Sequence, residues 1–193
     1  MKTTWFDFFN TFFEETCSEI GEVMYADGCR EGWLQGEMFR KSTDENFSVN
    51  SYKIMDDNKV TGTIDVYGEK PFENSQTQKM IAEIKIVASS FYTKCIDGNY
   101  NIESYSTKGI VKITQKHLDR VNHKEGSILK DMTRLLSIEE MNLQKYIILV
   151  IPEYEDITET PGLKKALSNI SLSNNCRELK YPEHDFSVRI WKI

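Results

Sequence analysis

The chain has 193 residues, 39% of them hydrophobic, which is enough for one soluble domain with a substantial core. No apolar run is long enough to cross a bilayer and no secretion signal is recognised, so we expect a cytoplasmic protein without a membrane partner. The four cysteines are scattered, which argues against a zinc site or a disulfide framework. The net charge of -6 argues against a coat of nucleic acid but permits a local basic groove.

An amphipathic helix is predicted over residues 4–26, where Thr4 and Asp7 have the spacing of a capping box. Apolar residues recur on one side at helical spacing: Trp5, Phe8, Phe9, Phe12, Phe13, Ile20 and Val23. Core packing explains this stripe. A homodimer interface is the alternative, because the buried centre of an interface favours the same residue types.

A second helix is predicted over residues 30–41. Glu37 lies beside its apolar stripe, so its carboxylate needs a partner, a metal ion or an edge open to water. A salt bridge to Arg40 or Lys41 is the structural interpretation, and a place in a catalytic site is the functional one. Glu31 is the competing acid on another side of the helix.

Residues 47–55 and 60–67 have the pattern of two strands, and the polar residues 56–59 between them suit a hairpin turn. The second strand carries Asp65. A polar loop is expected over residues 68–79 before the next strand.

That next strand, over residues 80–87, alternates apolar residues with Glu83 and Lys85, which therefore stand side by side on one face. The ordinary interpretation is a half-buried strand whose wet face carries both charges. If it pairs antiparallel with the strand of Asp65, the Asp65 and Glu83 carboxylates lie on the same face of neighbouring strands. Two carboxylates that close repel each other, and a divalent cation between them would remove the repulsion.

A basic segment follows, with a positively charged residue at every fourth position: Lys112, Lys116, Arg120 and Lys124. A solvated helix face is one interpretation, and contacts to the phosphates of a nucleic acid are the other.

The remaining elements are, in order, a helix over 127–137, a strand covered on both faces over 145–151, a short helix over 163–170 and a final edge strand over 186–193. In the last of these, Arg189 and Lys192 are candidate phosphate contacts.

The order of these elements, with Asp65 on one strand and the Glu83-x-Lys85 motif on the next, resembles the PD-(D/E)XK nuclease superfamily over roughly residues 28–151. Ile64 stands where the motif of that superfamily has proline. The resemblance implies an α/β (α+β) fold with a mixed β-sheet flanked by helices and an αβββαβ core. We therefore expect a single domain over residues 1–193, with an N-terminal helix over 4–26 and a C-terminal helix and edge strand over 162–193.

The resemblance also implies the chemistry. Asp65 and Glu83 would be ligands of Mg²⁺ or Mn²⁺, for which carboxylate oxygens are suitable donors. Glu37 would be an outer or second-metal ligand, and Lys85 would act beside the metal. The expected activity is hydrolysis of DNA by a homodimeric endonuclease of restriction or genome-defence type.

Two other interpretations stay open. The chain can be a non-catalytic member of the same fold that binds nucleic acid or a protein partner. It can also be an unrelated sensory or interaction domain in which Glu83 and Lys85 are surface charges.

Overall fold

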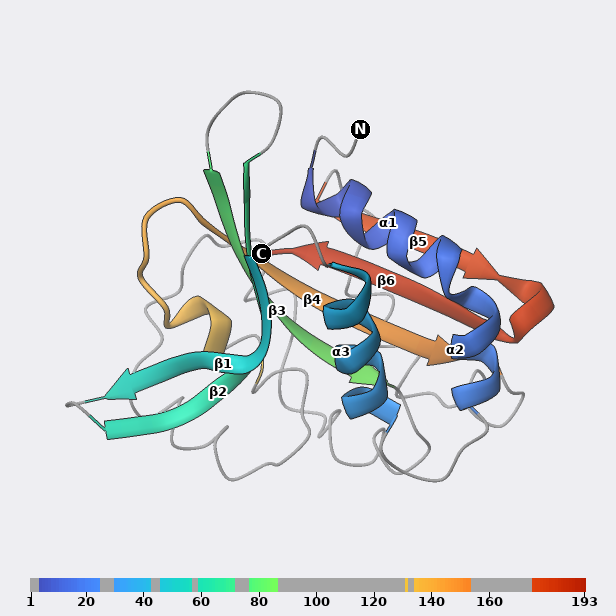
Figure 1. The fold of residues 1–193 in the computed structure, drawn as a ribbon, viewed down its shortest axis with the longest axis horizontal. Coiled ribbons are helices and arrows are strands. Elements are labelled where there is room, and N and C mark those ends of the chain that lie inside the picture. The colour runs from blue at the N-terminus through green and yellow to red at the C-terminus, as the bar shows by residue number, and fades with distance from the viewer. Residues whose placement is uncertain are drawn as a thin grey trace, which may run out of the picture.

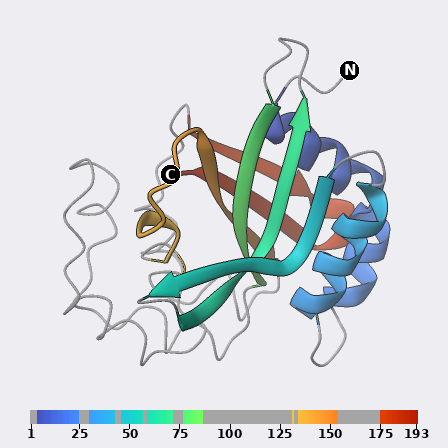
Figure 2. The same cartoon turned by 60° about the vertical axis from the view of Figure 1, so that its left-hand side comes forward.

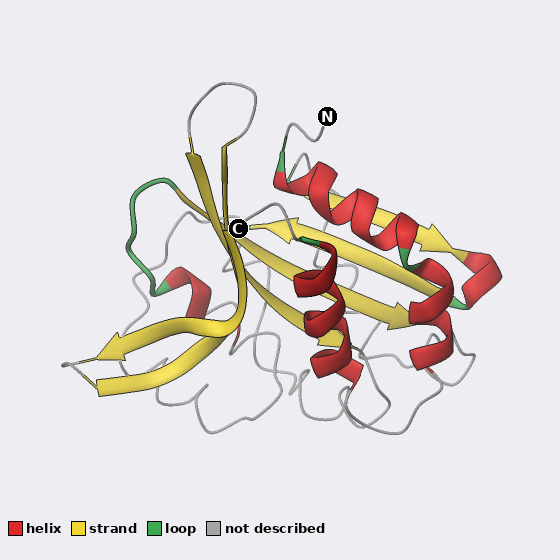
Figure 3. Cartoon of the chain, viewed as in Figure 1, coloured by secondary structure: helices red, strands yellow, loops and turns green. Residues whose placement is uncertain are grey.

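The computed structural model describes residues 4–24, 30–42, 46–56, 59–71, 77–86, 131, 134–153 and 175–193. Its elements are α1 (Trp5–Glu15), α2 (Cys17–Met24), α3 (Arg30–Lys41), β1 (Asn46–Asp56), β2 (Lys59–Pro71), β3 (Thr77–Ile86), β4 (Leu143–Pro152), β5 (Cys176–Tyr181), the 3-10 turn η1 (Pro182–His184) and β6 (Phe186–Lys192). They form a mixed α/β fold in which α1, α2 and α3 cover one face of a six-stranded sheet (Figures 1 and 3). None of the helices described is long and apolar enough to cross a membrane.

The strand order is β1-β2-β3-β4-β6-β5, with β3 and β4 parallel and the other neighbours antiparallel. The predicted hairpin and the buried central strand are confirmed as β1, β2 and β4. The prediction of a final edge strand is wrong, because β6 lies between β4 and β5. Both faces of β6 are buried, as the exposed fractions of Val188 (0%) and Trp191 (8%) show.

The predicted helix over residues 4–26 is divided at Thr16 into α1 and α2. Thr4 caps α1 as its spacing to Asp7 predicted, since the Asp7 main-chain amide donates to Thr4 Oγ1 over 3.2 Å. The apolar stripe packs on the sheet within the chain's own core, where five aromatic residues of α1 are at most 2% exposed: Trp5, Phe8, Phe9, Phe12 and Phe13. The route to a homodimer through this stripe is therefore wrong, although the homodimer itself stays a prediction.

Close contact between α1 and the sheet depends on Gly68 in β2. A Cβ atom at this position would lie 2.6 Å from Trp5 Cη2, well inside van der Waals contact. The absence of a side chain at Gly68 lets the indole ring of Trp5 lie directly on the strand.

The hairpin bends where a bulge in β1 lies opposite Asp65. The register shifts between Val49 and Tyr52, and Asn50 has a positive φ of 50°. The side-chain amide of Asn50 donates a hydrogen bond to Gln35 Oε1 over 2.8 Å, which holds the bent part of β1 against α3. Bulges bend and twist a strand. Accordingly, β2 pairs with β3 only from Val66 onward, and its first half, still paired with β1, bends away from β3 (Figures 1 and 2).

A second apolar cluster lies on the sheet face opposite α1, and helical residues 134–136 cover part of it (Figure 2). Leu135 is fully buried there. Of the helix predicted over 127–137, the structure describes residues 131 and 134–136 in helical conformation. The helix predicted over 163–170 lies outside the described residues.

Candidate active site

Beyond Val66 and Ala82 the strands β2 and β3 separate, and a side chain bridges this fork. The ladder ends at the pair Val66 and Ala82, and two residues further the same register would place Ile64 opposite Ile84. The Ile84 amide instead donates to Asp65 Oδ2 over 2.8 Å. An amide on an open strand edge needs an acceptor, and the Asp65 carboxylate supplies it at the point where the strands separate.

The acid of α3 that contacts β3 is Glu31, and not Glu37 as predicted. Glu31 Oε1 accepts from the Ile86 amide over 3.2 Å, and its Oε2 lies 3.4 Å from Lys85 Nζ. Glu37 instead pairs with Arg40, with 2.6 Å between Oε2 and Nη2, as the structural interpretation expected. Six residues of helix separate the two acids, which turns them to different sides.

Glu83 lies in the interior and not on a wet face. It is only 1% exposed, and its Oε1 accepts a hydrogen bond from Arg134 Nη1 over 2.8 Å. Burial, together with the nearby carboxylates of Asp131 and Asp65, raises the pKa of the Glu83 carboxyl to about 9, although Arg134 opposes this shift. The expectation of a solvated charge on this strand is therefore wrong for Glu83.

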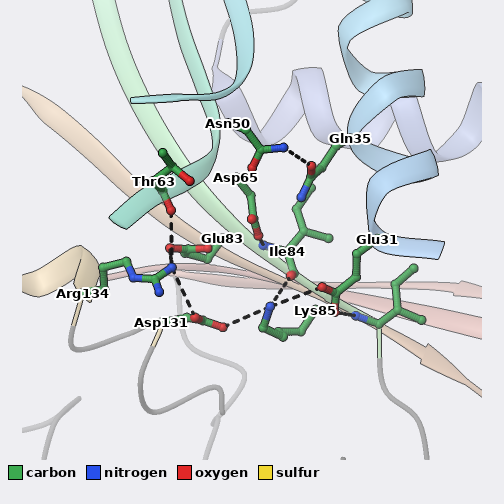
Figure 4. Close-up of polar contacts among 11 residues, drawn as sticks. Glu31, Gln35, Asn50, Thr63, Asp65, Glu83, Ile84, Lys85, Asp131 and Arg134 are labelled. Carbon is green, nitrogen blue, oxygen red and sulfur yellow. Dashed lines mark hydrogen bonds and ion pairs between the residues drawn. The ribbon is translucent and has the colours of Figure 1, made fainter. Parts of the chain in front are cut away.

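The Lys85 ammonium lies between Glu31 and Asp131 (Figure 4). Its ammonium donates to the Ile84 carbonyl over 3.1 Å and lies 3.4 Å from both Glu31 Oε2 and Asp131 Oδ2. Burial by itself lowers the pKa of Lys85, but the surrounding carboxylates, Asp131 foremost, outweigh it and raise the pKa above the ordinary value. Lys85 therefore stays positively charged.

The sequence did not single out Asp131 and Arg134. Asp131 is 3% exposed, and its Oδ2 accepts no hydrogen bond, although it forms the ion pair with Lys85. Burial raises the pKa of Asp131 to about 6, against the effect of Lys85 and Arg134. The available signal was an acid and a base three residues apart, on one side of the helix predicted over residues 127–137.

The cluster holds more acids than bases. Its four carboxylates and two cations are Glu31, Asp65, Glu83 and Asp131 with Lys85 and Arg134 (Figure 4). With every group ionised, two negative charges are uncompensated in a cluster whose Glu83 and Asp131 are buried. Such an excess favours the uptake of protons or of a divalent cation.

The donor set fits Mg²⁺ or Mn²⁺, since it consists of oxygen atoms and includes a buried carboxylate oxygen without a hydrogen bond. In their present positions, however, no three His, Cys, Asp or Glu side chains of the described residues form a group that could hold a metal ion. Lys85 and Arg134 lie among the carboxylates instead.

The predicted phosphate contacts are placed only in part. The basic residues Lys112, Lys116, Arg120 and Lys124 lie outside the described residues. Arg189 pairs with Glu178 of β5, with 2.9 Å between Nη2 and Oε1, and Lys192 lies at the end of β6.

No family model, no curated protein and no solved structure matches this chain. Its function is therefore inferred from the chemistry of the site.

Proposed function

We propose that this chain is a metal-dependent endonuclease that hydrolyses DNA phosphodiester bonds. One observation carries the proposal: Asp65 and Glu83 meet where β2 leaves β3, with Lys85 between them and the helix acid Glu31. The resulting excess of carboxylate over basic groups is what a divalent cation would balance.

Asp65 and Glu83 would hold Mg²⁺ or Mn²⁺, and Glu31 takes the outer position first given to Glu37. When bound, the ion would polarise a phosphate oxygen and lower the pKa of a coordinated water. Asp65 accepts a hydrogen bond from Ile84 and Glu83 is buried, so the fold holds both carboxylates at the end of the β2–β3 ladder.

Lys85 cannot be a metal ligand, because its neighbours keep it as an ammonium ion. Its movable donors suit a role in orienting the attacking water and in offsetting the negative charge that grows on the phosphate. Its hydrogen bond to the Ile84 carbonyl keeps it beside the carboxylates.

A second candidate is a non-catalytic protein of the same fold that binds nucleic acid or a protein partner. Its specific support is the salt bridge between Glu83 and Arg134, because a carboxylate neutralised in this way needs no metal.

The two candidates are separated by incubating plasmid and single-stranded DNA with the purified chain and Mg²⁺ or Mn²⁺, with EDTA as the metal-free control. The nuclease cleaves only with metal, and Asp65→Asn abolishes cleavage. Glu31→Gln impairs cleavage, whereas the matched change Glu37→Gln in the exposed pair leaves it intact. Absence of cleavage with either metal, or equal cleavage by Asp65→Asn, favours the binding protein.

A homodimer of restriction or genome-defence type extends the proposal, since two sites related by a two-fold axis cut both strands of a duplex in one encounter. Light scattering that reports a monomer at roughly tens of micromolar would remove this extension without affecting the hydrolytic site.

A further inference from the structure

One nitrogen atom of Arg134 lies among oxygen atoms from three separate elements. Its Nη1 is 2.8 Å from Glu83 Oε1 on β3, 3.4 Å from the Thr63 carbonyl oxygen on β2 and 3.8 Å from Asp131 Oδ1 (Figure 4). Two carboxylates and a main-chain carbonyl are donors that also suit a hard divalent cation.

The second oxygen of Asp131, Oδ2, lies on the Lys85 side of the carboxylate and gives a separate observation. Asp131 Oδ2 is buried and accepts no hydrogen bond, and its ion pair with Lys85 spans 3.4 Å. A buried carboxylate oxygen without a hydrogen bond is costly and rare, and it calls for a functional explanation. Asp131 therefore has capacity for a ligand that Arg134 and Lys85 do not fully supply.

We propose that the Glu83 and Asp131 carboxylates and the Thr63 carbonyl form a divalent-cation position that the Arg134 guanidinium fills in the metal-free protein. The metal ion and Arg134 then exclude each other. This inference rests on the proposed function in taking Glu83 as a metal ligand, and it adds Asp131 and Thr63 to the ligand set.

The geometry makes the exchange physically reasonable. Mg²⁺ binds oxygen at about 2.1 Å, shorter than any of the three distances to Nη1, so the carboxylates close in when the guanidinium leaves. Arg134 can leave because 22% of its side chain is exposed, whereas Glu83 is fixed at 1%. A divalent ion in place of one guanidinium also reduces the excess negative charge.

The displaced guanidinium gains a second role. Its planar donors match a phosphate, and it would be released beside the metal that holds the substrate. Metal binding would thus complete the ligand set and also free a side chain that can bind the phosphate.

The first test is calorimetric titration of Mn²⁺ into the parent chain, Arg134→Gln and the matched control Arg40→Gln, which removes the same charge from the exposed pair. Loss of the competitor should tighten Mn²⁺ binding by at least about tenfold in Arg134→Gln, because a nearby positive charge no longer repels the ion. Arg40→Gln should bind as the parent does. Mn²⁺ affinity in Arg134→Gln that equals or falls below that of the parent overturns the proposal.

The second test observes the parent chain itself, so it does not depend on the folding of Arg134→Gln. In the parent chain labelled with ¹⁵N-arginine, the Arg134 side-chain signal is assigned by its absence in Arg134→Lys. Saturating Mg²⁺ should shift this signal and speed its exchange with water, since the guanidinium leaves a buried pair. An Arg134 signal that Mg²⁺ does not change contradicts the proposal, even if Arg134→Gln fails to fold.

The outcomes distinguish this inference from the proposed function. Tighter Mn²⁺ binding by Arg134→Gln without DNA cleavage by the parent keeps the cation position and removes the nuclease. If the parent cleaves DNA but Arg134→Gln binds Mn²⁺ no more tightly than the parent and the Arg134 signal does not shift, the nuclease stands and the cation position is removed. If neither the parent nor Arg134→Gln binds Mn²⁺, both fail.

Discussion

Two groups of acids and bases lie near α3, and they differ in burial and in balance. On the outer side, Glu37 and Arg40 form a pair of one acid and one base, with 62% of the Arg40 side chain exposed. Beneath the fork, Glu83 and Asp131 are 1% and 3% exposed, and the surrounding cluster has two more acids than bases.

Charged acids and bases therefore affect the stability of the fold differently in the two groups. Water screens the outer pair, so its charges cost little and stabilise little. In the cluster, burial penalises the ionised forms of Glu83 and Asp131, and a proton or a cation would remove that penalty. Ionised Glu83 and Asp131 therefore cost the fold stability, whereas the outer pair does not.

The largest expected effect is stabilisation by a metal ion, which should act on the cluster and not on the outer pair. Mn²⁺ at 100 times its dissociation constant should raise the free energy of unfolding by about 2.7 kcal/mol. Melting curves with Mn²⁺ and with EDTA measure this. Glu37→Gln should retain the gain and Glu83→Gln should lose it; a gain that persists in Glu83→Gln would place the ion elsewhere.

Removal of the base from each group should have unequal effects. Arg134→Gln leaves the buried Glu83 without its charged donor, and metal-free stability should fall by about 2 kcal/mol. Arg40→Gln should change stability little, since its pair is exposed. Urea unfolding at neutral pH compares the two variants, and equal losses would show that burial does not set the difference.

Metal-free stability should depend on pH through the cluster. Burial raises the pKa of Glu83 from 4.5 in the unfolded chain to about 9, so between these values the folded chain holds a proton that the unfolded chain has lost. Stability should therefore fall as the pH rises through this window, by up to about 1.4 kcal/mol between about pH 7 and 8. Urea unfolding at both pH values measures the slope. Glu83→Gln should flatten it, and a parent chain that becomes more stable with rising pH would reverse the assignment.

The smallest effect concerns Asp65. Asp65→Asn keeps a side-chain oxygen that can accept from the Ile84 amide and removes one of the excess negative charges. We expect the metal-free variant to be more stable than the parent by about 0.5 kcal/mol, since function often costs stability. Differential scanning calorimetry measures it, and a clear loss of stability would show that the charge of Asp65 supports the fold.

Local patterns predicted the elements that carry the site. The helix over residues 30–41 has the predicted bounds, and the strands of Asp65, Glu83 and Lys85 form as expected, because periodicity along each segment determines them. The sequence also predicted that these three residues lie close together. The β2–β3 ladder ends at Val66 and Ala82, and one more pair in the same register would set Asp65 opposite Glu83.

Long-range geometry could not be predicted in this way. Helical periodicity places Glu37 and Glu31 on different sides but does not say which side meets β3. The fork depends on the bulge at Asn50 and its bond to Gln35, two residues without a local signal. Asp131 enters the site through a contact between segments far apart in the chain.

The central claim is that the fork is a hydrolytic site, and Lys85→Ala tests it most directly. Mn²⁺ titration calorimetry and plasmid nicking with Mg²⁺ are measured on the same preparations of parent and variant, after a melting curve shows that both are folded. The account predicts that Lys85→Ala binds Mn²⁺ at least as tightly as the parent, because an ammonium repels the ion, and that it no longer cleaves DNA. Cleavage by Lys85→Ala at the parent's rate would contradict it.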